Sequence, residues 1–179
     1  MRPVPSARRL LLAAIAALLI VPTAASAACR GADRPLSKGH LRQARAAVLC
    51  LHNIVRRAHG LHRLRLSATL TGAARRHTRQ MVRQRYFEHT SPGGSTLLTR
   101  ARAAGYLRSA FSFSLGENIG WGEGSLSTPR AMMRAWMHSP GHRANILRPQ
   151  FRDIGIGLVA RTPVGSGGGT FTTDFGRRG

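Results

Sequence analysis

The sequence predicts an α+β domain in which helices come first and strands last. Apolar residues recur every three or four positions through 41–58 and 67–85, which is the spacing of amphipathic helices. Near the C-terminus, 153–159 alternates apolar residues with glycine, and 170–175 is rich in β-branched and aromatic residues. Both patterns are typical of strands, and another strand is expected at 116–121. Helices followed by strands favour a layered α+β domain.

Local signals place the shorter helices. Ser95 is the expected N-cap of a third helix, and Gly105 is its expected stop. The Thr-Pro pair at 128–129 opens a fourth helix, because proline is favoured at the first helical position. The Ser-Pro-Gly sequence at 139–141 is expected to break this helix, and a short helical turn follows at 142–147.

Residues 1–27 resemble a secretory signal peptide. Arginines near the start precede an apolar run at 10–21 and a small-residue cleavage site at 25–27. The apolar run is shorter than the roughly 20 residues that a membrane-spanning helix needs, although an uncleaved anchor is the alternative. We therefore expect a secreted protein with no transmembrane segment in the mature chain. The expected organisation is an N-terminal segment at 28–40, tied down by a disulfide, and one domain at 41–179.

The chain has two cysteines, Cys29 and Cys50. Both would face an oxidising compartment after export, so a disulfide is the expected pairing and two free thiols are the alternative. Such a bond would constrain the unfolded chain by about 3 kcal/mol.

The chain is strongly basic, with 28 lysines and arginines against 6 acidic residues and a net charge of +22. This balance favours anionic partners such as cell-envelope polymers or lipid. The basic residues are spread along the chain without interleaved aromatic residues or a nucleic-acid motif, so specific nucleic-acid binding is not expected. A solvated basic surface without a dedicated partner is the simpler alternative. We expect a monomer.

Three segments are dense in residue types that build binding and catalytic sites. They are FEHTSPGG at 87–94, GENIGWG at 116–122 and WMHSPGHRANIL at 136–147. They contribute His89, Glu117 and His142, which we expect to meet at one cleft. The glycines of the second segment favour close passage of the backbone or positive φ. A buried salt bridge to one of the many arginines is the alternative interpretation of Glu117.

Other polar residues are expected to have structural roles. Three of them lie beside the apolar stripe of the first helix, where they are expected to hydrogen-bond to loops packed over that helix. The residues assigned structural roles are His52, Asn53, Arg56, Asn118, Trp136 and Asn145. His77 lies near the apolar face of the second helix and is interpreted as a core histidine.

The three dense segments, together with HNIVR at 52–56, DIGIGL at 153–158 and TTDFG at 172–176, resemble the CAP superfamily. This superfamily comprises cysteine-rich secretory proteins, antigen 5 and pathogenesis-related 1, and the match is to its bacterial secreted, SCP-like branch. The resemblance extends over about 48–176. It implies a three-layer α-β-α sandwich with a central antiparallel sheet.

The resemblance also implies a cleft that holds two histidines and two acids. His89, Glu117 and His142 match three of these positions. The fourth lies three residues after Trp136, where this chain has Ser139, so an acid/base mechanism that needs two carboxylates is in doubt. Some family members bind zinc or another divalent ion through the histidines, which makes His89 and His142 the expected metal ligands. A cleft that binds no metal is the alternative.

These observations lead to a hypothesis of a secreted ligand-binding or envelope-associated module. One rival is a metal-dependent hydrolase, peptidase-like, that acts on extracellular protein or cell-wall material. Another is a lipid- or sterol-binding protein, which the resemblance to some family members suggests. No motif pairs a serine or cysteine nucleophile with a base, so the sequence leaves catalysis open.

Overall fold

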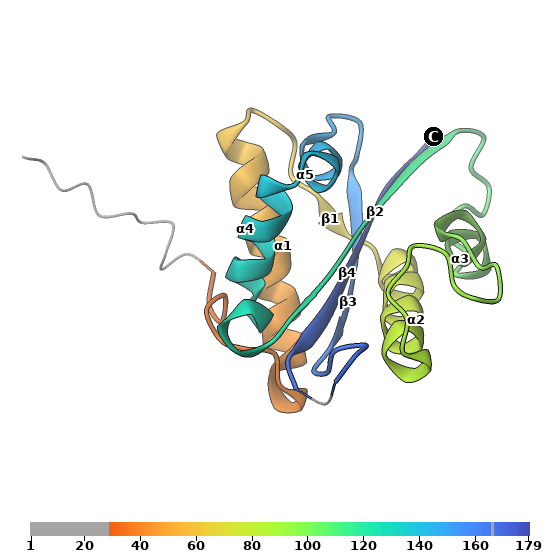
Figure 1. Cartoon of the computed structure of the whole chain (residues 1–179). Helices are drawn as coiled ribbons and strands as arrows, with labels where there is room; N and C mark the ends of the chain where they lie inside the picture. The colour runs from red at the N-terminus through yellow and green to blue at the C-terminus, as the bar shows by residue number, and fades with distance from the viewer. Residues whose placement is uncertain (1–28, 166) are drawn as a thin grey trace, which may run out of the picture.

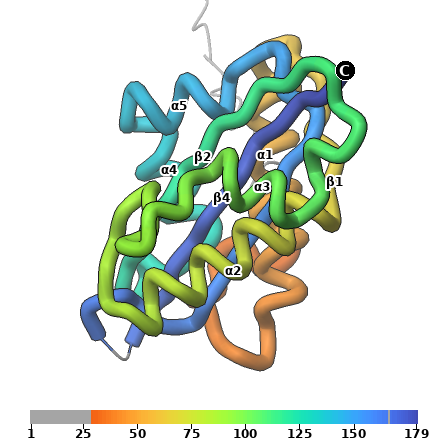
Figure 2. The backbone as a smooth tube through the Cα atoms, turned by 90° about the vertical axis from the view of Figure 1, so that its right-hand side faces the viewer, coloured from red at the N-terminus to blue at the C-terminus, as the bar shows by residue number. Residues whose placement is uncertain are grey.

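A four-stranded sheet separates two layers of helices in the computed structural model, which describes residues 29–165 and 167–179 (Figure 1). The signal peptide expected at 1–27 lies outside these residues. On one side of the sheet are α1 (Leu41–Ala58), α4 (Pro129–His138) and α5 (Pro140–Leu147). On the other side are α2 (Ala68–Gln84) and α3 (Leu97–Ala103) (Figure 2). Short 3-10 turns, η1 (Lys38–His40) and η2 (Gly124–Ser127), precede α1 and α4.

The sheet has the strand order β1-β3-β4-β2. Its strands are β1 (Arg65–Leu66), β2 (Phe113–Gly122), β3 (Asp153–Val159) and β4 (Gly169–Arg178). Strands β2 and β3 each run antiparallel to β4, whereas β1 runs parallel to β3. The predicted α-β-α sandwich is confirmed. The pattern did not reveal β1, because a two-residue edge strand is too short to show a periodicity.

Side-chain caps set the starts of the helices. Ser67 Oγ accepts a hydrogen bond from the Leu70 amide, and Thr128 Oγ1 accepts one from the Ala131 amide. The third helix begins one residue later than predicted, because its capping side chain is that of Thr96, which accepts from the Thr99 amide. The break between α4 and α5 is also shorter than predicted. Only the residue at 139 interrupts the two helices, and α5 begins at 140.

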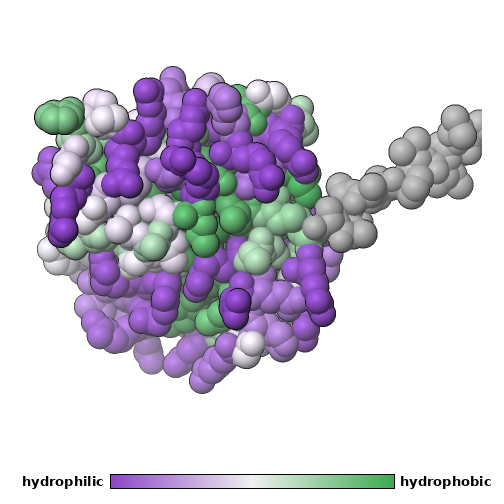
Figure 3. Space-filling view, turned by 180° about the vertical axis from the view of Figure 1, so that it is seen from behind, coloured by the Kyte–Doolittle hydropathy of each residue, from purple (hydrophilic) through white to green (hydrophobic). Residues whose placement is uncertain are grey.

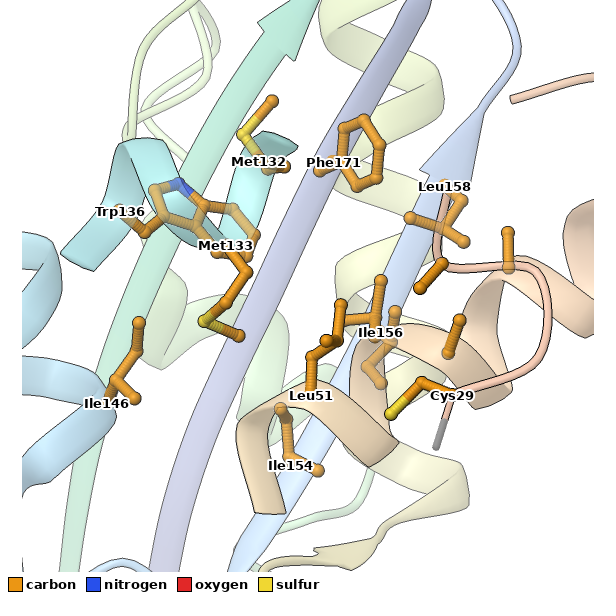
Figure 4. Packing of buried hydrophobic residues seen from close by; sticks show 14 of the residues in the cluster. Cys29, Leu51, Met132, Met133, Trp136, Ile146, Ile154, Ile156, Leu158 and Phe171 are labelled. Carbon is orange, nitrogen blue, oxygen red and sulfur yellow. The ribbon is translucent and has the colours of Figure 1, made fainter. Parts of the chain in front are cut away.

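The larger apolar core lies between the sheet and the layer of α1, α4 and α5 (Figure 4). It contains side chains from all three helices and from β3 and β4. Those labelled in Figure 4 are Cys29, Leu51, Met132, Met133, Trp136, Ile146, Ile154, Ile156, Leu158 and Phe171. A smaller cluster of Leu70, Ala101 and Tyr106 lies beneath α2 and α3. Burial of these side chains is the main favourable contribution to folding.

Helix α2 packs close to β3 because β3 presents glycines to it. A methyl group at Gly157 would overlap the backbone carbonyl of Ala74, and one at Gly155 would overlap that of Leu70. The alternation of glycine with apolar residues in β3 therefore has a steric reason. Apolar side chains face one helical layer, and bare backbone faces α2.

Two polar residues connect α1 to neighbouring segments. Asn53 donates to the Leu64 carbonyl at 3.1 Å and accepts from the Leu64 amide at 2.7 Å. The buried Arg56 guanidinium donates to the carbonyls of Ile146, at 2.7 Å, and Phe151, at 3.2 Å. His52 differs from expectation: its Nδ1 bonds within the helix, to the carbonyl oxygen four residues earlier, at 2.8 Å.

The predicted disulfide between Cys29 and Cys50 is confirmed, with 5.7 Å between the Cα atoms. It joins the first described residues to α1. An ion pair of 2.6 Å between Asp33 and Arg130 fastens the same segment to α4. Within the described part of the chain, no helix is both long and apolar enough to cross a membrane. Hydrophilic side chains spread over most of the face seen in Figure 3, around a central hydrophobic area.

Candidate functional site

Glu117, near the middle of β2, is the centre of the candidate site. Its side chain is only 3% exposed, and both carboxylate oxygens have a donor. His89 Nδ1 lies 2.9 Å from Oε1, and Arg100 Nη2 donates to Oε2 at 2.7 Å. Burial alone would raise the pKa of Glu117, but the hydrogen bond from His89 and the charge of Arg100 bring it below its usual range. Glu117 is therefore ionised at neutral pH.

Arg100, on α3, fixes the loop that carries the first histidine. Besides its bond to Glu117, its guanidinium donates to the carbonyl oxygens of His89, at 3.0 Å, and Ser95, at 2.8 Å. The side chain is 5% exposed. A buried arginine with this many donors engaged holds the loop to the sheet, because leaving any one of them unpaired would cost free energy.

His89 lies in the loop between α2 and α3, with 56% of its side chain exposed. Glu117 is an acceptor only, so Nδ1 of His89 carries the hydrogen of their bond and Nε2 is the nitrogen left for other partners. The hydrogen bond to Glu117 raises the pKa of His89. This histidine is consequently more easily charged than a free one.

His77, on α2, lies beside Glu117. Its side chain is fully buried, and Nε2 lies 3.9 Å from Glu117 Oε2. Burial lowers the pKa of His77 to about 4, so the ring is neutral at neutral pH. The sequence pattern identified it as a core histidine, and the structure shows that this buried ring also contacts the candidate site.

A second carboxyl group, Asp174 on β4, lies opposite Glu117 in the register of the two strands. It is fully buried, and no donor among the described residues reaches either of its oxygens. Burial, followed by the charge of Glu117, raises the pKa of Asp174 well above its usual range. The protonated form of Asp174 is therefore favoured. The chain thus has a second buried acid on β4, next to Glu117 on β2.

His142, on α5, is held by a chain of amide side chains. Asn118 donates to the His142 carbonyl at 3.0 Å, and Asn145 donates to Asn118 Oδ1 at 2.9 Å and to the Glu117 carbonyl at 3.1 Å. Burial, and then the charge of His89, lower the pKa of His142. Ser139 precedes α5 and makes no side-chain cap to it.

An apolar groove of about 310 Å³ adjoins His142 between β2 and α4. The chain's two tryptophans both line it, and Trp121 is 39% exposed. Trp136 is fixed by a bond of 3.1 Å from Nε1 to the Ile119 carbonyl. The complete lining is Phe87, Ile119, Gly120, Trp121, Leu126, Ala131, Met132, Ala135, Trp136 and His142.

Sequence reasoning missed Arg100, Asp174 and the groove. Asp174 stands inside TTDFG, but only the register of β4 against β2 brings it to Glu117. Arg100 is one of many arginines, and its sole signal was a position next to Ala101 on the inner face of a short helix. The groove combines residues of the three dense segments with residues of η2 and α4, and only the folded chain shows that they share one apolar surface.

Comparison with known families shows which family the chain belongs to. The model of the cysteine-rich secretory protein family, CAP, matches residues 49–173. The chain belongs to the CAP family. The matched residues thus include α1 from its middle onward, the whole groove and the site residues except Asp174.

Several relatives resemble this CAP domain. An uncharacterized protein of Bacillus subtilis strain 168, YkwD, is 37% identical over 112 residues, which is 63% of this chain but only 41% of YkwD. A solved extracellular protein with an SCP domain from Bacillus anthracis is 28% identical, with a TM-score of 0.63, and the match covers 80% of this chain and 45% of that one. An outer surface protein of Borrelia burgdorferi shares the fold, with a TM-score of 0.64 at 19% identity over 77% and 95% of the two chains.

The cleft of this CAP domain provides few ligands for a metal ion. His89 offers Nε2 and His142 offers its ring, but both oxygens of Glu117 are engaged and Asp174 is buried beneath it. Among the described residues, no three histidine, cysteine or acidic side chains are grouped to hold one ion. Catalytic zinc sites use three protein ligands. The residues therefore do not fit a resident catalytic zinc ion.

Proposed function

We propose that this CAP domain is an exported ligand-binding module whose cleft receives an apolar group in the groove and a polar group at the two histidines. The observation that carries the proposal is the groove itself. It is lined by aromatic and aliphatic side chains and opens beside His142. Apolar concave surfaces with a few convergent polar groups are typical of ligand sites.

The state of Glu117 supports binding over hydrolysis. A general base must reach a proton of substrate or water, whereas the Glu117 side chain is 3% exposed and already accepts hydrogen bonds from His89 and Arg100. Asp174 is fully buried. We infer that Glu117 positions His89 and stabilises the fold, and that it does not take part in acid/base chemistry.

Export is supported by the disulfide. A bond between Cys29 and Cys50 persists in oxidising compartments and is rare where thiols are kept reduced. The Bacillus anthracis relative is itself described as extracellular. Secretion through the segment at 1–27 is the route that we propose.

Energy transfer to a fluorescent probe tests the ligand site. Both tryptophans line the groove, so anilinonaphthalene sulfonate bound there should quench them and emit by energy transfer. Ala135→Phe fills the groove and should abolish the transfer. Ala46→Phe adds the same ring at an exposed position of α1 and should leave it unchanged. Equal effects of the two substitutions would overturn the proposal, as would hydrolysis of peptide, ester or glycan substrates that depends on His89.

A second proposal, weak binding of a divalent cation by the two histidines, rests on the orientation of His89. A carboxylate that accepts from one ring nitrogen fixes the tautomer and leaves the other nitrogen for a metal. Zinc titration by calorimetry should show one weak site that His142→Ala removes. Unchanged zinc binding in that variant would contradict this assignment.

A further inference from the structure

The outward side of α2 carries an arginine-rich surface. Arg75, Arg76, Arg79 and Arg83 are all exposed, and the first turn of α2 contains no acidic residue, nor does the rest of the helix. None of these four side chains makes a hydrogen bond or ion pair to another described residue. We refer to these four residues as the α2 arginine face.

The spacing of these arginines makes the face costly to the isolated protein. Arg75, Arg79 and Arg83 follow one another at intervals of four residues, which places them one above the next on the helix. Like charges at this spacing destabilise a helix by about 0.2–0.5 kcal/mol per pair. Arg75 also repels Arg45 of α1: burial, and then the charge of Arg75, lowers the pKa of Arg45. The charge of the face is therefore uncompensated within the described chain.

The face is hollowed. A depression of about 550 Å³ is lined by Arg76, Arg79, Gln80 and Arg83. Gln80 accepts a hydrogen bond of 3.0 Å from Ser91, which anchors the floor of the depression to the loop at 87–94. Planar guanidinium groups around a depression suit phosphate oxygens, because arginine binds phosphate through two parallel hydrogen bonds.

We propose that the α2 arginine face binds a linear, phosphate-bearing polyanion. The distance from Arg75 to Arg83 along the helix is about 12 Å, so the face spans several charged groups of an extended chain. This surface is separate from the apolar groove, and the proposal does not depend on the ligand assigned to the cleft.

Two other anionic partners fit the face less well. A lipid surface is bound most stably when apolar side chains insert beside the basic ones. The large apolar side chains that are exposed in the described chain are Leu66, Phe111, Phe113, Trp121, Leu126 and Val164, and none lies on α2. Single-stranded nucleic acid is held by aromatic rings that stack on bases, and α2 has no aromatic residue.

Binding of polyphosphate, measured by calorimetry, tests the proposal. The variant R76Q/R79Q/R83Q should bind about tenfold more weakly, since each exposed ion pair contributes up to about 1 kcal/mol. The control R42Q/R57Q/R143Q removes the same charge from exposed arginines of α1 and α5. Because these arginines lie outside the α2 arginine face and form no ion pair with the bound polyanion, the control should bind within about threefold of the unaltered protein. Equal losses in the two variants would show attraction by net charge alone and overturn the proposal.

Further measurements separate a binding defect from a folding defect and distinguish the partners. The α2 variant should unfold at no lower a temperature than the unaltered protein, because it loses like-charge repulsion. Ala135→Phe, in the groove, should bind polyphosphate normally whether or not the cleft binds a ligand. The α2 variant should lose more affinity for polyphosphate than for phosphatidylglycerol vesicles or single-stranded DNA. A larger loss for vesicles or DNA, or no binding of polyphosphate by the unaltered protein, would show that the assigned partner is wrong.

Discussion

Glu117 makes its largest contribution as the partner of a buried cation. Replacing it by glutamine leaves the Arg100 guanidinium, 5% exposed, without a counter-charge. We expect Glu117→Gln to lower the free energy of unfolding by about 3 kcal/mol, as breaking one side of a buried pair does. Urea denaturation measures this change. Glu123→Gln, at an exposed acid, is the matched control, and equal effects of both substitutions would contradict the account.

The protonation of Asp174 gives a second prediction for a single residue. Its pKa is raised in the folded protein, so the folded state binds a proton that the unfolded state, with a pKa of about 3.9, releases. The contribution of this group to stability is present below the unfolded pKa and is lost as pH rises. Asp174→Asn cannot titrate. We therefore expect the variant to gain stability relative to the unaltered protein as pH rises above the unfolded pKa of about 4.

Urea denaturation at several pH values measures this difference between the two proteins. A difference that does not change with pH would mean that Asp174 has an ordinary pKa. A difference that falls as pH rises would reverse the sign of its assigned shift.

At the scale of elements, the packing of α2 on β3 depends on bare backbone. Gly157→Ala forces a methyl group into the carbonyl of Ala74, and overpacking of this kind costs about 1–3 kcal/mol. Gly93→Ala is the control, because nothing lies within 4 Å of the added methyl group and the backbone there needs no positive φ. Thermal unfolding compares the two. Similar melting temperatures would show that α2 can shift away from β3 at little cost.

Most elements follow from short-range patterns. The helices α1, α2 and α4 and the strands β3 and β4 were predicted near their observed bounds, because each has a periodicity or a cap in its own sequence. The exact start of α3 was missed because Ser95 and Thr96 are both good caps, and only the backbone conformation chooses between them.

The candidate site was only partly predictable for a different reason. His89, Glu117 and His142 stand in distinctive segments, so each could be identified separately. Asp174 and Arg100 reach Glu117 through strand register and helix packing. These long-range contacts have no signature in a single sequence. The burial of Asp174 in particular depends on a pairing between β2 and β4 that periodicity does not specify.

At the scale of the whole molecule, the disulfide is expected to stabilise the fold by constraining the unfolded chain. Replacing both Cys29 and Cys50 by serine should lower the free energy of unfolding by about 3 kcal/mol, the loop-closure contribution expected for this separation. Urea denaturation of the double variant against the oxidised protein measures it. Adding a reducing agent should destabilise the unaltered protein equally and leave the variant unchanged. An undiminished stability of the variant would contradict a structural role for the bond.

The central claim, that the groove between β2 and α4 is a ligand site, is tested most directly by the two indole N–H signals in the NMR spectrum. Trp121 and Trp136 are the chain's only tryptophans and both line the groove. Titration with anilinonaphthalene sulfonate should shift both signals along one binding curve, and Ala135→Phe should remove the shift. Binding of the probe that leaves both indole signals in place would contradict the claim.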